Sequence, residues 1–316
     1  MNHLTSRAYA GAPDLHLLIE FAERAAKARW PRSTYKKVGD VVWTMLTPQF
    51  DPHLNIMLWF EGTELVAYAS FEPPLNLEFD IQPGLALYDS LGDEILTWAE
   101  NRARSLAYAG HQTIPKALAM IGYETVLLTE ALDSDKQRLS LLERHGFKRT
   151  DGFGVLYRCS LTDPISVPKL DPSLRLRHAT DADLEARVEV HREAWSVWGP
   201  SKVTVETYAR LRSAPVYDPE LDVVLEDASG RFLSYCIGWL DSRNGFGHFE
   251  PVGCRPDCTG RGYARAVTIE GMRRMQSRGM HTALVGTASV NERARVLYPS
   301  CGFLEVDRAY HYTKSF

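Results

Sequence analysis

The stretch VGCRPDCTGRGYA, Val252–Ala264, decides how this chain is read. It follows an apolar, strand-like run and leads into a helix-like run, Gly262–Arg278. A strand that ends in a glycine-rich turn at a helix N-terminus exposes backbone N–H groups at the positive end of the helix dipole. Gly260, Gly262 and Ala264 keep this turn open, since larger side chains would block close approach. The stretch therefore predicts an anion site suited to a pyrophosphate.

The spacing argues against two common phosphate loops. There is no GxxxxGK[ST] pattern with its lysine, so a nucleoside triphosphate site is not expected. The glycines are spaced GxGxA rather than GxGxxG, which disfavours a dinucleotide-binding fold. Arg261 and Arg265 add charge that can pair with phosphate oxygens. The alternative is an ordinary glycine-rich turn that only ends a strand.

A second motif lies downstream in SVNERARVLYPSCGF, Ser289–Phe303, after the apolar and β-branched run Thr282–Thr287. Together the two stretches resemble the GNAT superfamily of acyl-CoA-dependent N-acyltransferases. The resemblance departs at Thr259, where the family has Gln or Arg, and at Pro299, which we expect to end or kink the helix. The residues that match the family's loop and later helix are Pro256, Gly260, Gly262, Ala264, Asn291, Ala294, Leu297, Tyr298, Gly302 and Phe303.

Length and composition fit a soluble globular protein of two domains. The chain has 316 residues, of which 45% are hydrophobic and 24% charged, and its net charge is −4. This balance argues against a protein that binds nucleic acid or an anionic membrane. The N-terminus does not have the pattern of a signal peptide, and no apolar run reaches about 20 residues, so we expect a cytoplasmic protein.

The cysteines fit the same compartment. Five scattered cysteines in a chain of this length indicate reduced thiols. Cys254 and Cys258 form a single C-x₃-C pair without a second pair of ligands, so we expect no metal site.

An internal repeat predicts the domain organisation. Asn55–Pro73 and Leu221–Asp241 both read as two strands around a glycine-containing turn, and Leu139–Phe147 echoes Val296–Phe303. The proline-rich segment Leu161–Pro172 reads as an exposed linker. We therefore predict an α/β (α+β mixed sheet) fold with two tandem GNAT-like domains, each a mixed, mostly antiparallel sheet flanked by helices. The predicted ranges are a degenerate domain at 1–163, a linker at 164–172 and an acyl-CoA-binding domain at 173–316.

The first copy reads as a lost acyl-CoA site. Bulky side chains fill the region that corresponds to the loop, where only Gly92 is a plausible counterpart of the loop glycines. Asp89, Asp93 and Glu94 crowd the expected helix start, where they would repel a pyrophosphate. Leu142 or Glu143 takes the position of Tyr298, and we place most of this copy's extra residues at 109–123. Tandem layouts with one degenerate half occur in the superfamily, and the mycothiol synthases are similar in layout.

The resemblance also implies a set of site residues. Members typically transfer the acyl group directly from the thioester to an amine. This requires groups that bind the pyrophosphate, a hydrogen-bond donor to the thioester oxygen, a base for the ammonium and an acid for the leaving thiolate. Val252 is the implied backbone donor, Tyr298 the acid, and Asn291 either caps its helix or bonds the pantetheine arm. The implied acyl-CoA contacts are Val252, Gly253, Cys254, Thr259, Gly260, Arg261, Gly262, Tyr263, Ala264 and Asn291.

The base is sought on the strand that precedes the loop. Period-two alternation puts His248, Glu250, Val252 and Cys254 on one face. Glu250 is the first candidate, directly or through water, and His248 the second, because an ordinary imidazole takes up a proton near neutrality. Both residues would otherwise be ordinary polar residues of a half-exposed strand. Cys254 raises a covalent alternative, but a buried, inert thiol is the favoured explanation.

The sequence therefore predicts an acetyl-CoA-dependent N-acetyltransferase with one working site, in the C-terminal half. The acyl donor is acetyl-CoA or another short acyl-CoA, and the acceptor is a small-molecule primary amine that the sequence does not identify. Candidate walls of the acceptor pocket are Trp195, Trp198, Tyr208 and Trp239. The alternatives are a non-catalytic acyl-CoA-binding regulatory protein and an interaction protein that uses the fold only as a scaffold.

Overall fold

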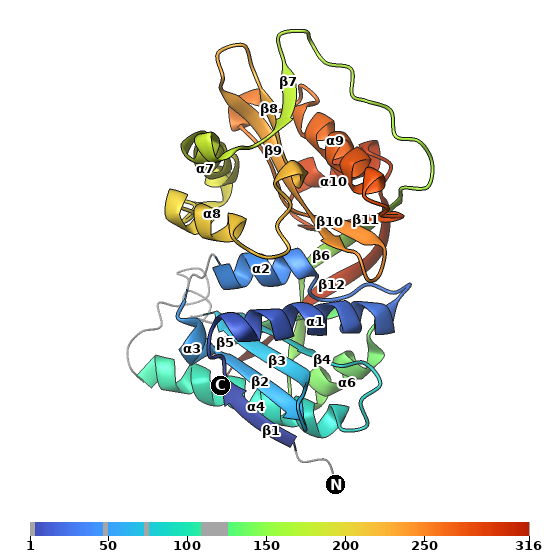
Figure 1. The fold of residues 1–316 in the computed structure, drawn as a ribbon. Coiled ribbons are helices and arrows are strands. Elements are labelled where there is room, and N and C mark those ends of the chain that lie inside the picture. Colours follow the sequence, from blue (N-terminus) through green and yellow to red (C-terminus); the bar gives the residue numbers. More distant parts are fainter. Residues whose placement is uncertain (1–3, 47–49, 73–75, 109–125, 316) are drawn as a thin grey trace. The chain divides into compact units, whose positions relative to one another are not determined.

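The two halves of the chain repeat one order of helices and strands. The computed structural model describes residues 4–46, 50–72, 76–108 and 126–315 (Figure 1). The predicted insertion at 109–123 lies outside these ranges. The first half runs through β1 (Leu4–Ala8), α1 (Ala12–Arg29), α2 (Val38–Leu46), α3 (Pro52–Asn55), β2 (Ile56–Glu61), β3 (Glu64–Glu72), β4 (Asn76–Ile81), α4 (Tyr88–Tyr108), β5 (Val126–Leu132), α6 (Lys136–Arg144) and β6 (Lys148–Ser160).

The second half follows the same order, with short 3₁₀ turns at its helix ends. After the irregular segment that was predicted as a linker come β7 (Arg175–His178), η1 (Asp181–Asp183), α7 (Leu184–Trp195), η2 (Ser196–Trp198), α8 (Val205–Arg212), η3 (Pro219–Leu221), β8 (Asp222–Glu226), β9 (Phe232–Asp241), β10 (Phe246–Cys254), η4 (Pro256–Cys258), α9 (Tyr263–Ser277), β11 (Thr282–Ala288), α10 (Glu292–Ser300) and β12 (Leu304–Ser315). The predicted mixed α/β fold and its internal repeat are confirmed.

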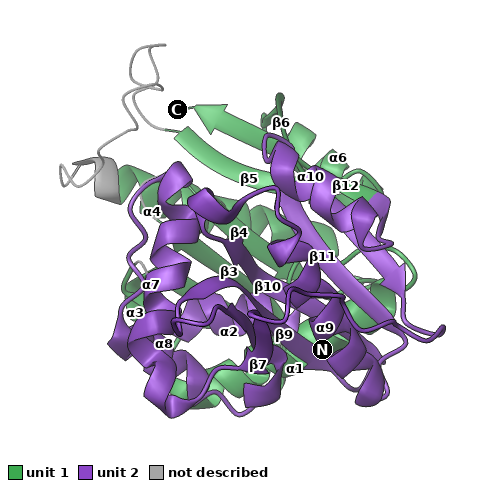
Figure 2. Cartoon of the chain, turned by 90° about the horizontal axis from the view of Figure 1, so that it is seen from above, with its two compact units in different colours: residues 1–36, 48–155, 307–316 green, residues 37–47, 156–306 purple. Residues whose placement is uncertain are grey.

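The chain divides into two compact units whose limits differ from the predicted ranges. Unit 1 is Met1–Lys36, Pro48–Val155 and Asp307–Phe316, and unit 2 is Lys37–Thr47 and Leu156–Val306 (Figure 2). Two strands begin in one unit and end in the other, namely β6 and β12, and α2 belongs to unit 2 although it comes from the first half. A proline-rich linker in the sequence does not indicate which strands cross from one unit to the other, because this crossing depends on long-range strand pairing.

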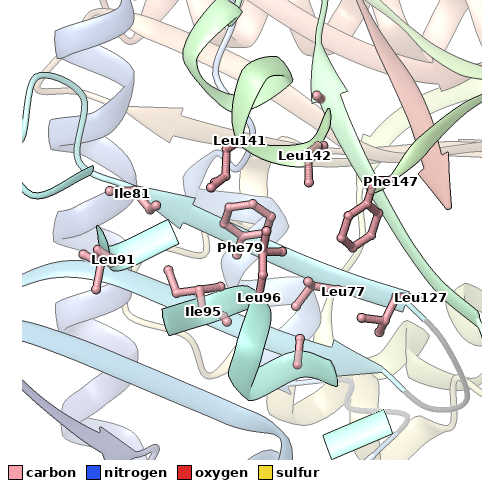
Figure 3. Close-up of a cluster of buried hydrophobic side chains, with 14 of the residues drawn as sticks. Leu77, Phe79, Ile81, Leu91, Ile95, Leu96, Leu127, Leu141, Leu142 and Phe147 are labelled. Atoms are coloured by element: carbon pink, nitrogen blue, oxygen red, sulfur yellow. The ribbon is translucent and has the colours of Figure 1, made fainter. Parts of the chain in front are cut away.

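Unit 1 is a sheet with a continuous apolar core. Its strands follow the order β1-β2-β3-β4-β5-β12-β6, and β12 pairs with β5 from Ala309↔Leu132 to Ser315↔Val126. The core is drawn in Figure 3, where side chains of the sheet meet those of α4 and α6. The residues labelled there are Leu77, Phe79, Ile81, Leu91, Ile95, Leu96, Leu127, Leu141, Leu142 and Phe147.

Unit 2 is built around β9 and β10, with different helices on its two faces. Its strands follow the order β6-β11-β10-β9-β8-β7. A Cβ on Gly238 of β9 would meet Met275 of α9, whereas the ring of the next residue, Trp239, lies against Gly39 of α2. Since neighbouring residues of a strand point to opposite faces, α9 covers one face and α2 the other. A Cβ on Gly253 would meet Ala194 of α7, on the same face as α2.

Most elements expected from the second half are confirmed. Thr180 caps the start of its first helical segment in a capping box with Asp183. The two β-strands of each predicted pair form around their turns, as β2 and β3 in unit 1 and β8 and β9 in unit 2. Pro299 lies inside α10, which ends one residue later at Ser300, as the missing proline N–H predicts.

Two further observations concern the described residues only. No helix among them is long and apolar enough to cross a membrane. All five cysteines carry free thiols.

Candidate active site

A bulge in β10 shapes the site. Phe249 pairs with Gly238 and Val252 pairs with Cys236, so three steps along β10 match two steps along β9. Pro251, which follows a cis peptide bond from Glu250, lies in this bulge. A proline has no N–H to donate to a strand ladder, which is why bulges tolerate it. The extra residue bends the strand and changes which face the following side chains occupy.

The predicted common face of β10 is therefore wrong. His248 pairs with Trp239, whereas Val252 pairs with Cys236, and Trp239 and Cys236 lie an odd number of residues apart on β9. Paired residues share a face, so His248 lies on the face covered by α2, while Val252 and Cys254 lie on the α9 face. Period-two alternation failed here because the bulge adds one residue, and Pro251 was the signal in the sequence.

The strands β10 and β11 part beside this bulge. Their parallel pairing runs from Phe246↔Thr282 to His248↔Leu284 and ends there, although both strands continue. Further along, the Arg255 N–H donates to the Leu233 carbonyl of β9, at 3.0 Å. N–H groups alternate in direction along a strand, so the Val252 N–H points away from β9, toward the side where β11 has diverged. This amide is thus placed as a donor beside a gap in the ladder.

The glycine-rich turn after β10 has the backbone that the sequence predicted. Gly260 and Gly262 both have φ of +79°, which L-residues with side chains adopt only under strain. A Cβ built on either glycine meets no atom within 4 Å, so the space in front of the turn is open. Gly262 caps α9 without a side-chain hydrogen bond, which leaves N–H groups of the first turn directed at an approaching anion.

Arginines border this turn at its exposed side. Arg261 is exposed, and the Arg265 guanidinium donates to the Ser300 carbonyl at 3.1 Å, which links the first turn of α9 to the end of α10. Thr259, at the position where the family has Gln or Arg, donates its hydroxyl to the Pro256 carbonyl at 3.0 Å. The turn is therefore held by its own hydrogen bonds and carries positive charge.

Tyr298 is buried between aromatic rings near the bulge. Only 5% of its surface is exposed. The centre of its ring lies 5.7 Å from that of Tyr157 and 5.9 Å from that of Phe303. Burial raises the pKa of its phenol strongly, and the negative charge of Glu250 raises it further. A phenol in this setting stays protonated at neutral pH and is available as a proton donor.

Glu250 occupies the bulge and is half-buried. Its charge acts on Tyr298 and also raises the pKa of Tyr235, so its carboxylate lies within electrostatic reach of both phenols. The backbone carbonyl of Glu250 accepts a hydrogen bond of 2.7 Å from the indole N–H of Trp239. The structure thus brings the first candidate base and the candidate acid into one neighbourhood.

His248 is buried on the other face of the sheet. Its side chain is 1% exposed, and among the described residues neither ring nitrogen has a hydrogen-bond partner. Asp40 of α2 is its nearest charge, with Oδ1 at 3.7 Å from Nε2. Burial lowers the pKa of His248 to about 3, although Asp40 opposes this shift, so the ring is neutral at neutral pH.

The remaining sequence-predicted residues have defined environments. Asn291 caps α10 by accepting the Ala294 N–H at 3.2 Å, so its carbonyl oxygen serves the helix and its amide group remains for other contacts. Burial raises the pKa of Cys254 to about 11, so its thiol is protonated at neutral pH. A protonated thiol is a poor nucleophile, which disfavours the covalent alternative. No group of three or more potential ligands suited to a metal ion occurs in the described parts of the chain.

The candidate acceptor walls have different environments. Tyr208 donates to the buried carboxylate of Asp222 at 2.5 Å, and Trp239 is fully buried, so both act as core residues. The Trp195 indole donates to the Tyr235 hydroxyl at 2.9 Å, while Trp198 is 55% exposed. Sequence reasoning missed α2 as part of this unit, because its contacts there lie about 200 positions away in the chain.

The matching region of unit 1 has one open glycine with positive φ in the turn before its helix, where the turn before α9 has two. Gly92 lies inside α4 against Leu141, so it is not the loop counterpart that the sequence suggested; Gly84, with φ of +80°, lies in the turn before α4. Asp93 is held by Arg144, the last residue of α6, at 2.9 Å and by the following His145 at 2.8 Å. Leu142 and Tyr298 each lie seven positions after the cap residue of their helix, and Leu142 is a core residue without a hydroxyl.

Comparison with known proteins identifies relatives of this arrangement. Residues 187–303 match the model of the family described as Acetyltransferase (GNAT) family. The chain is 24% identical over 302 residues to a mycothiol acetyltransferase from Thermobispora bispora, with 92% of each chain covered. It is 26% identical over 214 residues to one from Saccharomonospora viridis, covering 61% of this chain and 70% of that protein.

Solved structures share the fold across both halves. A GCN5-related N-acetyltransferase from Sphaerobacter thermophilus superimposes with a TM-score of 0.64 at 20% identity, over 99% of this chain and 95% of that one. A tandem GNAT protein from the clavulanic acid biosynthesis pathway gives a TM-score of 0.66 at 15% identity, over 99% and 98%. At these identities the likeness concerns the fold alone.

Proposed function

We propose that this chain, which belongs to the GNAT family of acetyltransferases, carries out acetyl transfer at one site in its C-terminal half. The donor in this proposal is acetyl-CoA and the acceptor is a small-molecule primary amine. The observation that supports it most is the open, glycine-rich turn at the N-terminus of α9, which directly follows the bulge of β10. This turn offers backbone donors to a pyrophosphate, and the diverging strands beside it leave a backbone donor for a thioester.

The proposed chemistry is direct transfer. Glu250 takes a proton from the acceptor ammonium, directly or through water, and the freed amine attacks the thioester carbonyl carbon. The Val252 N–H stabilises the negative charge on the carbonyl oxygen. As the carbon–sulfur bond breaks, Tyr298 gives its proton to the leaving thiolate, and the nitrogen gives up its second proton to the Tyr298 phenolate, directly or through water. The products are an amide and free CoA thiol, and Glu250 returns its proton to solvent. Gly260, Gly262 and the first turn of α9 hold the pyrophosphate.

His248 and Cys254 have no step in this scheme. His248 is already neutral, but its ring lies on the face opposite to Val252, and its pKa of about 3 makes it a weak base. The Cys254 thiol lies near the Ser234 side chain and the Ala264 N–H, and it is protonated. We therefore assign Cys254 to the wall of the acyl-CoA site.

Screening amines with an assay for free thiol tests the proposed reaction. The full chain with acetyl-CoA should release CoA thiol only when an acceptable amine is present, and mass spectrometry should show the amine heavier by one acetyl group. The curated relatives carry the name mycothiol acetyltransferase, so an amine related to mycothiol is the first acceptor to include. If acetyl-CoA raises the melting temperature but no amine is acetylated, the chain is instead a non-catalytic acyl-CoA-binding regulatory protein.

A further inference from the structure

We propose that α2, a helix from the N-terminal half, positions the catalytic base of the C-terminal half. The indole of Trp239 packs directly against Gly39, and its N–H donates to the backbone carbonyl of Glu250 in the bulge of β10. The inference rests on the proposed role of Glu250 as base. It makes Gly39 and Trp239 positioning residues, because neither touches the reacting atoms.

The first contact is steric and places the helix against the ring. A Cβ added to Gly39 would lie 2.2 Å from the Cδ1 and Cγ atoms of Trp239, well inside van der Waals contact. Gly39 is part of the α2 helix, where glycine is less favourable than alanine. The missing side chain is therefore what lets the backbone of α2 lie on the face of the indole.

The second contact fixes the indole. Trp239 is fully buried, and Tyr217 packs edge-on against it with ring centres 6.0 Å apart. The Tyr217 hydroxyl in turn donates to the buried carboxylate of Asp222 at 2.9 Å. A large ring held by close-packed neighbours cannot shift without displacing them.

The third contact connects the fixed indole to the backbone of Glu250, the proposed base. The Trp239 indole N–H donates to the Glu250 carbonyl at 2.7 Å, at the place where the bulge interrupts the ladder to β9. The bulge frees this part of the backbone from regular pairing, so a side-chain donor sets its orientation. The orientation of the Glu250 backbone decides where its carboxylate lies relative to Tyr298.

The test adds a methyl group to α2. Gly39→Ala should push the indole away from the Glu250 carbonyl and lower kcat on the order of 10²-fold, because small displacements of a catalytic group have costs of this size. The acetyl-CoA Kd should stay within about threefold, since the turn before α9 is untouched. Trp239→Phe removes the donor together with part of the ring and should lower kcat in the same way. The double variant should be no slower than Trp239→Phe, because both changes break one contact chain.

A matched glycine in unit 1 supplies the control. A Cβ on Gly92 would lie 2.5 Å from the end of the Leu141 side chain, so Gly92→Ala adds the same methyl group at a buried contact of a helix in unit 1. This variant should keep kcat. Equal losses of kcat in Gly92→Ala and Gly39→Ala, or a Gly39→Ala enzyme with full kcat, would overturn the proposal. So would a fall in kcat, acetyl-CoA affinity and melting temperature together, which indicates only a damaged fold.

A second readout does not depend on activity. In protein labelled with ¹⁵N-tryptophan, the indole N–H signal of Trp239, assigned by its loss in Trp239→Phe, should be protected from hydrogen exchange in the wild type and exchange much faster in Gly39→Ala. Unchanged protection in Gly39→Ala contradicts the contact chain itself. If protection is lost but no amine is ever acetylated by the wild type, the positioning contact stands and the proposed function fails.

Discussion

Tyr298 is the side chain on which the departure of the thiolate depends in our account. Burial and the charge of Glu250 keep its phenol protonated, so one proton is available for the leaving group. Tyr298→Phe removes that proton and keeps the ring that packs against Phe303. Turnover should fall on the order of 10²-fold while acetyl-CoA affinity stays nearly unchanged, as steady-state kinetics and calorimetry would show. Unchanged turnover, with chemistry shown to be rate-limiting, would remove Tyr298 from the mechanism.

The pH–rate profile distinguishes the two candidate bases. The pKa of His248 is lowered to about 3, so this residue carries no proton above about pH 4 and cannot produce a limb near neutrality. Glu250→Gln should therefore lower kcat/KM and remove or shift the acidic limb, whereas His248→Gln should leave the limb in place. A limb that moves only in the His248 variant would transfer the role of base to His248.

At the residue scale, the sequence predicted what depends on local backbone. Gly260 and Gly262 were expected in a turn that admits an anion, and both have the positive φ that favours glycine. The need for glycine at position 39 could not be recognised in the same way, because it comes from the indole of Trp239, which lies 200 positions further along the chain. Residues whose role comes from tertiary contacts leave no local signal.

At the scale of single elements, β10 shows where the prediction failed. Its position and the turn after it were predicted correctly from apolar residues and glycines. The sheet face on which each of its side chains lies was predicted wrongly. Period-two alternation assumes an uninterrupted strand, and the bulge at Pro251 adds one residue. Proline inside an expected strand is the feature that should prompt a search for such a bulge.

The start of α4 tests the claim that the first copy has lost its ligand. Asp89 and Asp93 lie at the first turns of α4, and Arg144 bonds Asp93 there. Changing both to Asn removes negative charge and ion pairs that are exposed to solvent and therefore weak. Because no acetyl-CoA binds at this helix in our account, calorimetry should give an unchanged Kd and stoichiometry. Tighter binding or a second site in the double variant would contradict this.

At the scale of the whole molecule, the strand exchange explains why the predicted division at the linker is incomplete. Unit 2 needs Lys37–Thr47 and the end of β6, and residues from Asp307 onward belong to unit 1. The order of elements could be predicted from the repeat in the sequence. The exchange could not, because equivalent strands of two similar copies have similar local patterns and only long-range pairing distinguishes them.

This organisation predicts the behaviour of a fragment. A C-terminal fragment from Pro172 onward lacks α2 and β6, so the Trp239 ring loses Gly39 and β11 loses its neighbouring strand. The fragment should be poorly soluble or inactive, as sedimentation and the thiol assay would show. As a control, the full chain with a protease site inserted at 164–172 and cut after folding should keep its activity. Full activity of the soluble fragment would contradict this account.

The central claim is that one working acyl-CoA site lies in the C-terminal half, and calorimetric titration of the full chain with acetyl-CoA tests it most directly. Gly262→Asp adds bulk and negative charge at the turn, and Gly84→Asp makes the same change in unit 1 at a glycine of almost identical φ, +80°. We predict one site per chain in the wild type, no binding in Gly262→Asp and unchanged binding in Gly84→Asp. Two equivalent sites, or binding that survives Gly262→Asp and is lost in Gly84→Asp, would contradict the claim.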